Sequence, residues 1–125
     1  IIKEKSSGII RLKSNNNEIN ENIQRNFIIE VDMPDAIKKD QLLKPRISIK
    51  NNSTTIQLAC FEIRQKINDI IKVLEIEGIK LKSQKEIELA PKLALTSPGI
   101  YELEFVILNR IGRTLVKESK NISIY

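Results

Sequence analysis

The sequence contains no histidine and only one cysteine, Cys60. The absence of histidine excludes Ser-His-Asp and Cys-His nucleophilic systems, and it excludes every metal site that needs an imidazole ligand. One cysteine cannot form an intrachain disulfide, and without histidine it cannot complete a structural zinc site. Because Cys60 ends the apolar run IQLAC, we expect a small buried hydrophobe there rather than a reactive thiol.

Glycine and aromatic residues are scarce as well. The four glycines are far apart, so the sequence has no glycine-rich loop for phosphate, and it has no loop of alternating acids for calcium. Tryptophan is absent, and the aromatic residues are three phenylalanines and two tyrosines. These leave little surface for stacking against bases or sugar rings. We therefore expect no catalytic, cofactor-binding or metal-binding residues, and no cofactor.

Length and composition indicate one folded domain. The chain has 125 residues, of which 41% are hydrophobic and 30% charged, which is enough for one core. Isoleucine and other β-branched residues are prominent, which favours strands. No apolar run approaches the ~20 residues of a membrane-spanning helix. Since the chain begins at Ile1 and its only methionine is Met33, we expect a fragment or processed form of a longer chain.

The net charge of +5 comes from 21 basic and 16 acidic residues, which are interspersed rather than grouped in blocks. This pattern indicates a solvated surface with a weak attraction for acidic partners. Nucleic-acid binding is an alternative, but single-strand binding also needs exposed aromatics, and Phe27, Tyr101 and Phe105 fall on predicted core faces. The basic residues that could contact phosphates are Lys38, Lys39, Lys44, Arg46, Lys80, Lys82, Lys85, Arg110, Arg113, Lys117 and Lys120.

Alternation of apolar and polar residues predicts strands along most of the chain. We expect strands at 8–12, 27–33, 46–50, 55–63, 86–89, 101–108, 114–116 and 121–125, and a loop at 14–22. A change of apolar face between Cys60 and Phe61 predicts a bulge or a twist. Residues 67–76 fit a helix or a strand, and their β-branched content favours the strand. Asp35 could cap a short helical turn that reaches Leu43 and ends before Pro45.

Roughly seven to nine short strands at intervals of about ten residues predict an all-β antiparallel sandwich. No internal repeat is visible, and the absence of strand–helix–strand alternation argues against a doubly wound sheet. We expect one domain overall, with an N-terminal strand and Asn-rich loop over 1–26 and the sandwich over 27–125.

Two stretches carry a resemblance, VDMPDAIKKDQLLKPRISIKNNS and IELAPKLALTSPGIYELEFVILNRIGRT. In the first, a strand ends near a proline and another ends in an Asn-rich turn. In the second, the turn Pro98-Gly99 precedes a strand led by Tyr101 and a loop that contains Asn109 and Gly112. This layout resembles immunoglobulin-like domains of bacterial and archaeal proteins over 27–125, and it implies their antiparallel sandwich without the disulfide and core tryptophan of antibody domains.

The layout is also similar, more narrowly, to the C-terminal carbohydrate-binding domain of O-antigen ABC transporters. That family is an immunoglobulin-like sandwich that recognises the end of a polysaccharide before export, so this resemblance implies a glycan-binding module. No residue of the present sequence matches a specific sugar-binding position of that family.

Two pairs of carboxylates remain as candidate chemistry. Glu75 with Glu77, and Glu102 with Glu104, each share one face of a predicted strand. Paired carboxylates can hydrolyse glycosides, but such an enzyme also needs an aromatic-lined cleft. We interpret both pairs as outward residues opposite an apolar face.

Three asparagines, Asn51, Asn52 and Asn121, begin N-x-[ST] sequons. We interpret Asn51 and Asn52 first as turn residues, because asparagine side chains readily bond to the backbone of a turn.

These patterns predict a non-catalytic interaction or structural module of a larger surface, envelope or filament protein. We expect it to bind a protein neighbour, or neighbouring domains of the same chain, by sheet-edge or sheet-face contacts. The opening run IIKEKSSGIIRLK and the closing run NISIY are candidate strands for such an edge. A glycan-binding module and a basic nucleic-acid-binding domain are the alternatives. An extracytoplasmic or cell-surface location is the one we favour.

Overall fold

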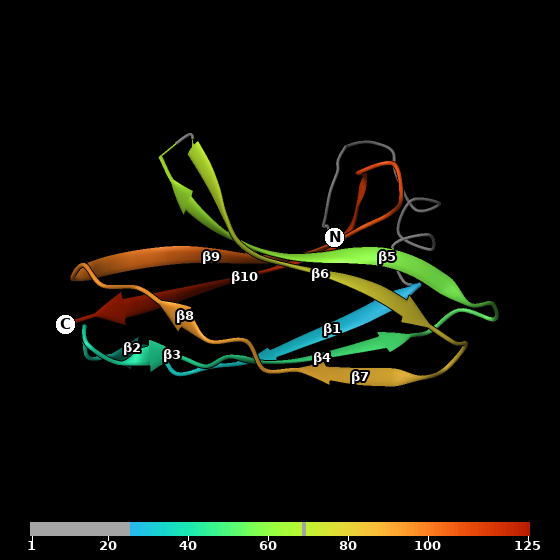
Figure 1. Ribbon diagram of the computed structural model, residues 1–125, viewed down its shortest axis with the longest axis horizontal. Helices are drawn as coiled ribbons and strands as arrows, with labels where there is room; N and C mark the ends of the chain where they lie inside the picture. The colour runs from blue at the N-terminus through green and yellow to red at the C-terminus, as the bar shows by residue number, and fades with distance from the viewer. Residues whose placement is uncertain (1–25, 69) are drawn as a thin grey trace.

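The computed structural model describes residues 26–68 and 70–125, and within them the chain forms ten strands and no helix. Figure 1 shows two facing layers, with the tip of the β5–β6 hairpin standing away from them. Seven strands have four or more residues, and three have only two. The strands are β1 (Phe27–Asp32), β2 (Ala36–Ile37), β3 (Leu42–Leu43), β4 (Arg46–Asn51), β5 (Gln57–Ile67), β6 (Ile70–Leu81), β7 (Glu86–Leu89), β8 (Leu93–Ala94), β9 (Gly99–Leu108) and β10 (Thr114–Ile124).

The strands form two main sheets and a small ladder. One sheet is antiparallel and has the order β1-β4-β7, and the other has the order β2-β10-β9-β5-β6. Among the described strands, β2 and β10 are the parallel pair, and the remaining pairs are antiparallel. β3 and β8 form the separate ladder. This arrangement is an immunoglobulin-like antiparallel β-sandwich, so the predicted fold class is confirmed.

Alternate residues of the two sheets fill the space between the layers. All three phenylalanines of the chain lie in this core, so none of them is available for stacking against a base or a sugar. The buried core residues of the two sheets are Phe27, Ile29, Ile47 and Ile49 from the three-stranded sheet and Ile37, Phe61, Ile63, Ile79, Leu81, Leu103, Phe105, Ile107, Ile122 and Ile124 from the five-stranded sheet.

The predicted helical turn from Asp35 to Leu43 is wrong. This stretch forms β2 beside the end of β10 and β3 beside β8. Ile37 and Leu43 are both buried in the core. Two short pairings, one in the five-stranded sheet and one in the separate β3–β8 ladder, bury both side chains and satisfy the local backbone. One isolated helical turn would leave most of its backbone groups unpaired.

Within the stretch 67–76, Ile67 ends β5 and residues 70–76 belong to β6, so these residues are extended, as their β-branched content predicts. The register of the β5–β6 hairpin shifts after Ile63: Ile63 lies opposite Glu75, and Arg64 lies opposite Val73. Leu74 is therefore the extra residue of a β-bulge. The bulge predicted between Cys60 and Phe61 is wrong, because pairing is regular there. Because both sides of β5 carry apolar residues, the sequence pattern there looks like a change of apolar face.

Asn51, at the end of β4, is fully buried and holds two turns together. Its Nδ2 donates to the carbonyl oxygens of Thr55 and Leu81, at 2.9 and 2.7 Å. Its Oδ1 accepts from the backbone N and the Oγ of Ser53, at 2.9 and 2.6 Å. The side chain thus organises the turn that follows it, as expected for asparagine, and its burial closes the Asn51 sequon to glycosylation.

The stretch from Ser97 into β9 contains a hydrogen bond that is typical of immunoglobulin-like sandwiches. The Tyr101 hydroxyl donates to the carbonyl oxygen of Ser97 at 2.7 Å, which is the tyrosine corner near the start of the sixth sandwich strand. At the far end of β9, Asn109 Oδ1 accepts from the backbone N of Arg113 at 2.8 Å. Gly112 has a φ of 85° in this loop, as its glycine predicts.

The strand predicted at 8–12 and the loop predicted at 14–22 lie outside the described residues, so the division at residue 26 stays a prediction. Within the described ranges, no helix is long and apolar enough to cross a membrane.

Candidate functional site

The strand β6 is an edge of the five-stranded sheet. Its 12 residues pair with β5 on one side and, in the part of the chain that the structure describes, with no strand on the other. An edge strand exposes a row of backbone N–H and C=O groups that can pair with another chain. β6 is thus the longest open edge among the described strands. No local pattern of residues predicted which strand would take this position.

The outer side of β6 is apolar and exposed. Ile71, Val73 and Ile76 lie opposite Lys66, Arg64 and Glu62 of β5, all on the side that faces away from the core. Their exposed fractions are 49%, 45% and 60%. We call Ile71, Val73 and Ile76 the outer stripe. Solvent exposure of three neighbouring β-branched side chains on one strand is unfavourable and marks a surface that a partner could cover.

The inner side of β6 carries the first carboxylate pair. Glu77 lies opposite Phe61, and Glu75 lies opposite Ile63. Because directly opposite residues point to the same side of a sheet, both glutamates lie on the core side, at the open flank of the sandwich. The prediction that they share one face is confirmed, but their predicted outward orientation is wrong. Alternation alone cannot tell which side of an edge strand faces the core. From Ile71 to Ile76 the apolar side faces solvent, whereas Ile79 and Leu81 of the same strand lie on the inner side and are buried.

A pocket of about 210 Å³ opens beside this pair. Phe61, Glu75 and Glu77 line it from the five-stranded sheet, and Leu89, Ala90 and Pro91 line it from the edge of the other sheet. Glu75 is half-buried and Glu77 is exposed. The pocket therefore joins two carboxylates to an apolar wall, and it lies at the open edge of β6.

The second carboxylate pair lies on the outer side of β9, as predicted. Glu104 is only 4% exposed, and its Oε2 is 3.5 Å from Lys117 Nζ on β10. Farther along the same side, Val106 and Leu108 are buried, so the apolar end of this face is covered. Glu104 is thus engaged in an ion pair with Lys117.

Cys60 lies on the outer side of β5 and is half-buried, so it is not the core hydrophobe that its sequence context predicted. Burial raises the pKa of its thiol above 9.0, the negative charge of Glu62 raises this pKa further, and Arg64 opposes the rise. A raised pKa leaves less thiolate at neutral pH.

We expect Cys60 to react slowly with iodoacetamide at pH 8 and its rate to keep rising past pH 9, because only the thiolate is nucleophilic. E62Q should raise the rate at pH 8, and R64Q should lower it. The same chain unfolded in urea is the control, since it has no other cysteine. A rate in the folded protein equal to that in urea would contradict the raised pKa.

The basic residues are spread over different elements rather than over one strand. Of the basic residues named above as possible phosphate contacts, three are in ion pairs within the described residues. These pairs are Arg46 with Glu88, Lys117 with Glu104, and Lys120 with Glu118. The others considered above lie on loops at 38–44, around the end of β6 and on the β9–β10 loop. This distribution is typical of a solvated surface and gives no stripe of the kind that follows a nucleic-acid backbone.

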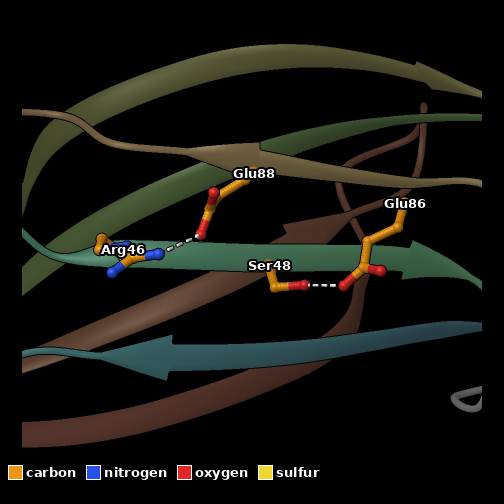
Figure 2. A network of polar contacts seen from close by, with 4 residues as sticks. All are labelled: Arg46, Ser48, Glu86 and Glu88. Atoms are coloured by element: carbon orange, nitrogen blue, oxygen red, sulfur yellow. Dashed lines mark hydrogen bonds and ion pairs between the residues drawn. The ribbon is translucent and has the colours of Figure 1, made fainter.

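The outer face of the three-stranded sheet is polar. Figure 2 shows Arg46 Nη2 3.3 Å from Glu88 Oε2, and the Ser48 hydroxyl donating to the Glu86 carboxylate. The Arg46–Glu88 pair is largely exposed, so it contributes little to stability. Ile28 of β1, opposite Lys50, is an exposed apolar residue on this face, and it has polar or charged neighbours rather than an apolar stripe.

Neither family models nor curated proteins give a match to this sequence. Solved structures do share its fold. One is the CARDB domain of the PF1109 protein from Pyrococcus furiosus, in complex with di-metal ions, at 15% identity and a TM-score of 0.64; the match covers 78% of this chain and 91% of that domain. In the present chain, the described residues contain no group of three or more acids and cysteines placed to hold a metal.

Other structures with this fold are β-glucosidases. The enzyme from Listeria innocua, in complex with glucose, matches at 13% identity and a TM-score of 0.64, over 78% of this chain and 16% of the enzyme. EmGH1 from Erythrobacter marinus matches at 11% identity and a TM-score of 0.64, over 79% of this chain and 15% of the enzyme. The chain thus spans about a sixth of the length of these enzymes. At such identities the likeness shows the immunoglobulin-like fold alone.

Proposed function

We propose that this chain is a non-catalytic interaction module of a larger surface, envelope or filament protein, and that it binds an extended segment of a protein neighbour along the open edge of β6. The observation that carries the proposal is the unpaired 12-residue strand with an exposed apolar outer stripe. An added strand would pair with the free backbone groups, and its outward side chains would cover the stripe.

The solved structures support the modular part of the proposal. In the β-glucosidases this fold makes up a minor part of a longer chain, and in PF1109 it was studied as a separate domain. A sandwich of this kind often serves as a spacer or binding unit between other domains.

Charged residues on edge strands commonly prevent pairing, and β6 contains Lys72, Glu75, Glu77 and Lys80. Three of these, Lys72, Glu75 and Glu77, lie on the inner side of the strand, and Lys80 lies on the outer side, opposite Leu58. Lys80 is beyond the outer stripe, so Ile71, Val73 and Ile76 form an uncharged stretch. The charges of β6 therefore restrict which segment can pair, and the outer stripe stays open to a suitable one.

We expect I76K and V73K to weaken binding of strand-forming peptides by about tenfold or more, because each places an ammonium group where the partner's apolar side chains would pack. Peptides would be selected by phage display on the immobilised domain and measured by fluorescence anisotropy. Hydrogen exchange would show whether β6 amides gain protection.

The matched control is I111K, which makes the same change at an isoleucine that is 82% exposed on the β9–β10 loop. It should bind as the parent does. If the peptides bind I76K and V73K as tightly as the parent, or if amides outside β6 gain the protection, the β6 edge is not the binding site. Binding to polysaccharide that resists salt would favour the glycan-binding alternative suggested by the resemblance to O-antigen transporters, and DNA binding with a steep salt dependence would favour nucleic acid.

A further inference from the structure

We infer that the segment bound at β6 carries two basic residues separated by one apolar residue, and that the pocket beside Glu75 and Glu77 receives a lysine or arginine side chain from it. This inference rests on the proposed function and adds the chemistry of the partner.

The geometry of an added strand sets the spacing of the motif. Side chains of a strand alternate between the two sides of the sheet, with a rise of about 3.3 Å per residue. Glu75 and Glu77 are two residues apart on the inner side of β6, and Ile76 lies between them on the outer side. Residues i and i+2 of an added strand therefore face the two carboxylates, while residue i+1 packs beside Ile76.

The size of the pocket fits one side chain. Sites for small molecules and cofactors usually have about 300–1,000 Å³, and one water occupies about 30 Å³ of liquid. At about 210 Å³ this pocket is too small for a cofactor and too large for a single water. Its apolar wall of Leu89, Ala90 and Pro91 suits the methylene stem of a long basic side chain, and the carboxylates suit the charged end.

The two carboxylates have no ionic partner within the described residues, because none of the ion pairs there involves Glu75 or Glu77. Lys72 lies on the same side of β6 beyond the bulge at Leu74, so the acidic stretch ends there and is limited to two residues. The chain as a whole carries +5, which would attract acidic partners at long range. Selection of a basic segment therefore depends on these two side chains at contact distance.

The test uses three labelled peptides and fluorescence anisotropy at 150 mM salt, where charges more than about 8 Å apart are largely screened. The alternating basic peptide is TVKVKVT, and TVEVEVT is its acidic counterpart. The third peptide, TVVKKVT, has the same composition as TVKVKVT, but its two lysines are adjacent and do not alternate with valine. The variants are E75Q/E77Q, the charge reversal E75K/E77K and, as control, E86Q/E88Q. This control removes the same charge from β7, on the outer face of the other sheet. Thermal denaturation would verify that each variant is folded.

We expect TVKVKVT to bind the parent and E86Q/E88Q equally, and at least about fivefold more tightly than TVVKKVT or TVEVEVT. E75Q/E77Q should lose this preference, and E75K/E77K should bind TVEVEVT instead. If all three peptides bind alike and E75Q/E77Q has no effect, while I76K still abolishes binding, the basic motif is wrong and the edge stands. If no peptide binds, or if I76K also has no effect, both the motif and the edge are wrong.

Discussion

Replacing Asn51 by alanine is expected to lower the free energy of unfolding by about 3 kcal/mol. The side chain is fully buried and makes four hydrogen bonds that join the end of β4 to the turn after it and to the end of β6. Alanine would leave the Leu81 carbonyl oxygen without this donor in a site closed to water, and each buried group left unpaired costs about 1–3 kcal/mol. Urea denaturation followed by circular dichroism would measure the change.

The neighbouring N52A variant is the control, because Asn52 is exposed and precedes the same turn. Its effect should stay within about 0.5 kcal/mol, as for other surface substitutions. A loss in N52A as large as that in N51A would mean that the turn, and not the buried amide, supplies the stability. N51D should also be strongly destabilised, since it removes the donor and buries a charge.

Replacing Phe105 by alanine is expected to cost about 4 kcal/mol. Phe105 is 0% exposed at the centre of β9, the middle strand of the five-stranded sheet, and it packs into the core between the layers. Truncation removes the buried ring and leaves a cavity that surrounding strands cannot fully close, and Phe-to-Ala changes in cores typically cost about 3–5 kcal/mol. The same denaturation measurement applies.

V106A is the matched variant for this test. Val106 is also 0% exposed and adjacent on the strand, but it points to the outer side and does not belong to the core between the sheets. The loss of two methyl groups should cost about 2 kcal/mol. Equal losses in V106A and F105A would contradict the assignment of the core to the inner side of β9.

The sequence predicted the longer strands in which apolar and polar residues alternate simply, including the edge strands β1 and β7. Phe105 and its neighbours alternate as a central strand should, and the Pro98-Gly99 turn and Gly112 bound the strand as predicted. The sequence could not predict β2 and β3, because two-residue strands have no pattern of their own and exist only through β10 and β8. Their pairing is a long-range property of the chain.

The candidate site was harder to predict from the sequence than the fold was. The spacing of Glu75 and Glu77 correctly predicted that both lie on one face of the strand. The predicted side of the sheet, away from the core, was wrong. The apolar–polar pattern of β6 looks the same whether the apolar side is buried or exposed, and the edge position that leaves it exposed is set by the strand order. The pocket needs residues 89–91 from the other sheet, which no local pattern connects to β6.

The pairing of β2 with the end of β10 has a mechanical consequence. The two strands are parallel, and the backbone N of Ser123, Tyr125 and Lys39 donates to the carbonyl oxygens of Asp35, Ile37 and Tyr125, at 2.9, 3.1 and 2.7 Å. In a parallel pair, the start of one strand and the end of the other lie at opposite ends of the ladder. Tension that pulls the beginning of β2 away from the end of β10 therefore loads these hydrogen bonds in shear, all at the same time, and does not open them one after another. A sandwich closed in this way resists separation of the end of β10 from the beginning of β2 along the direction of the two strands.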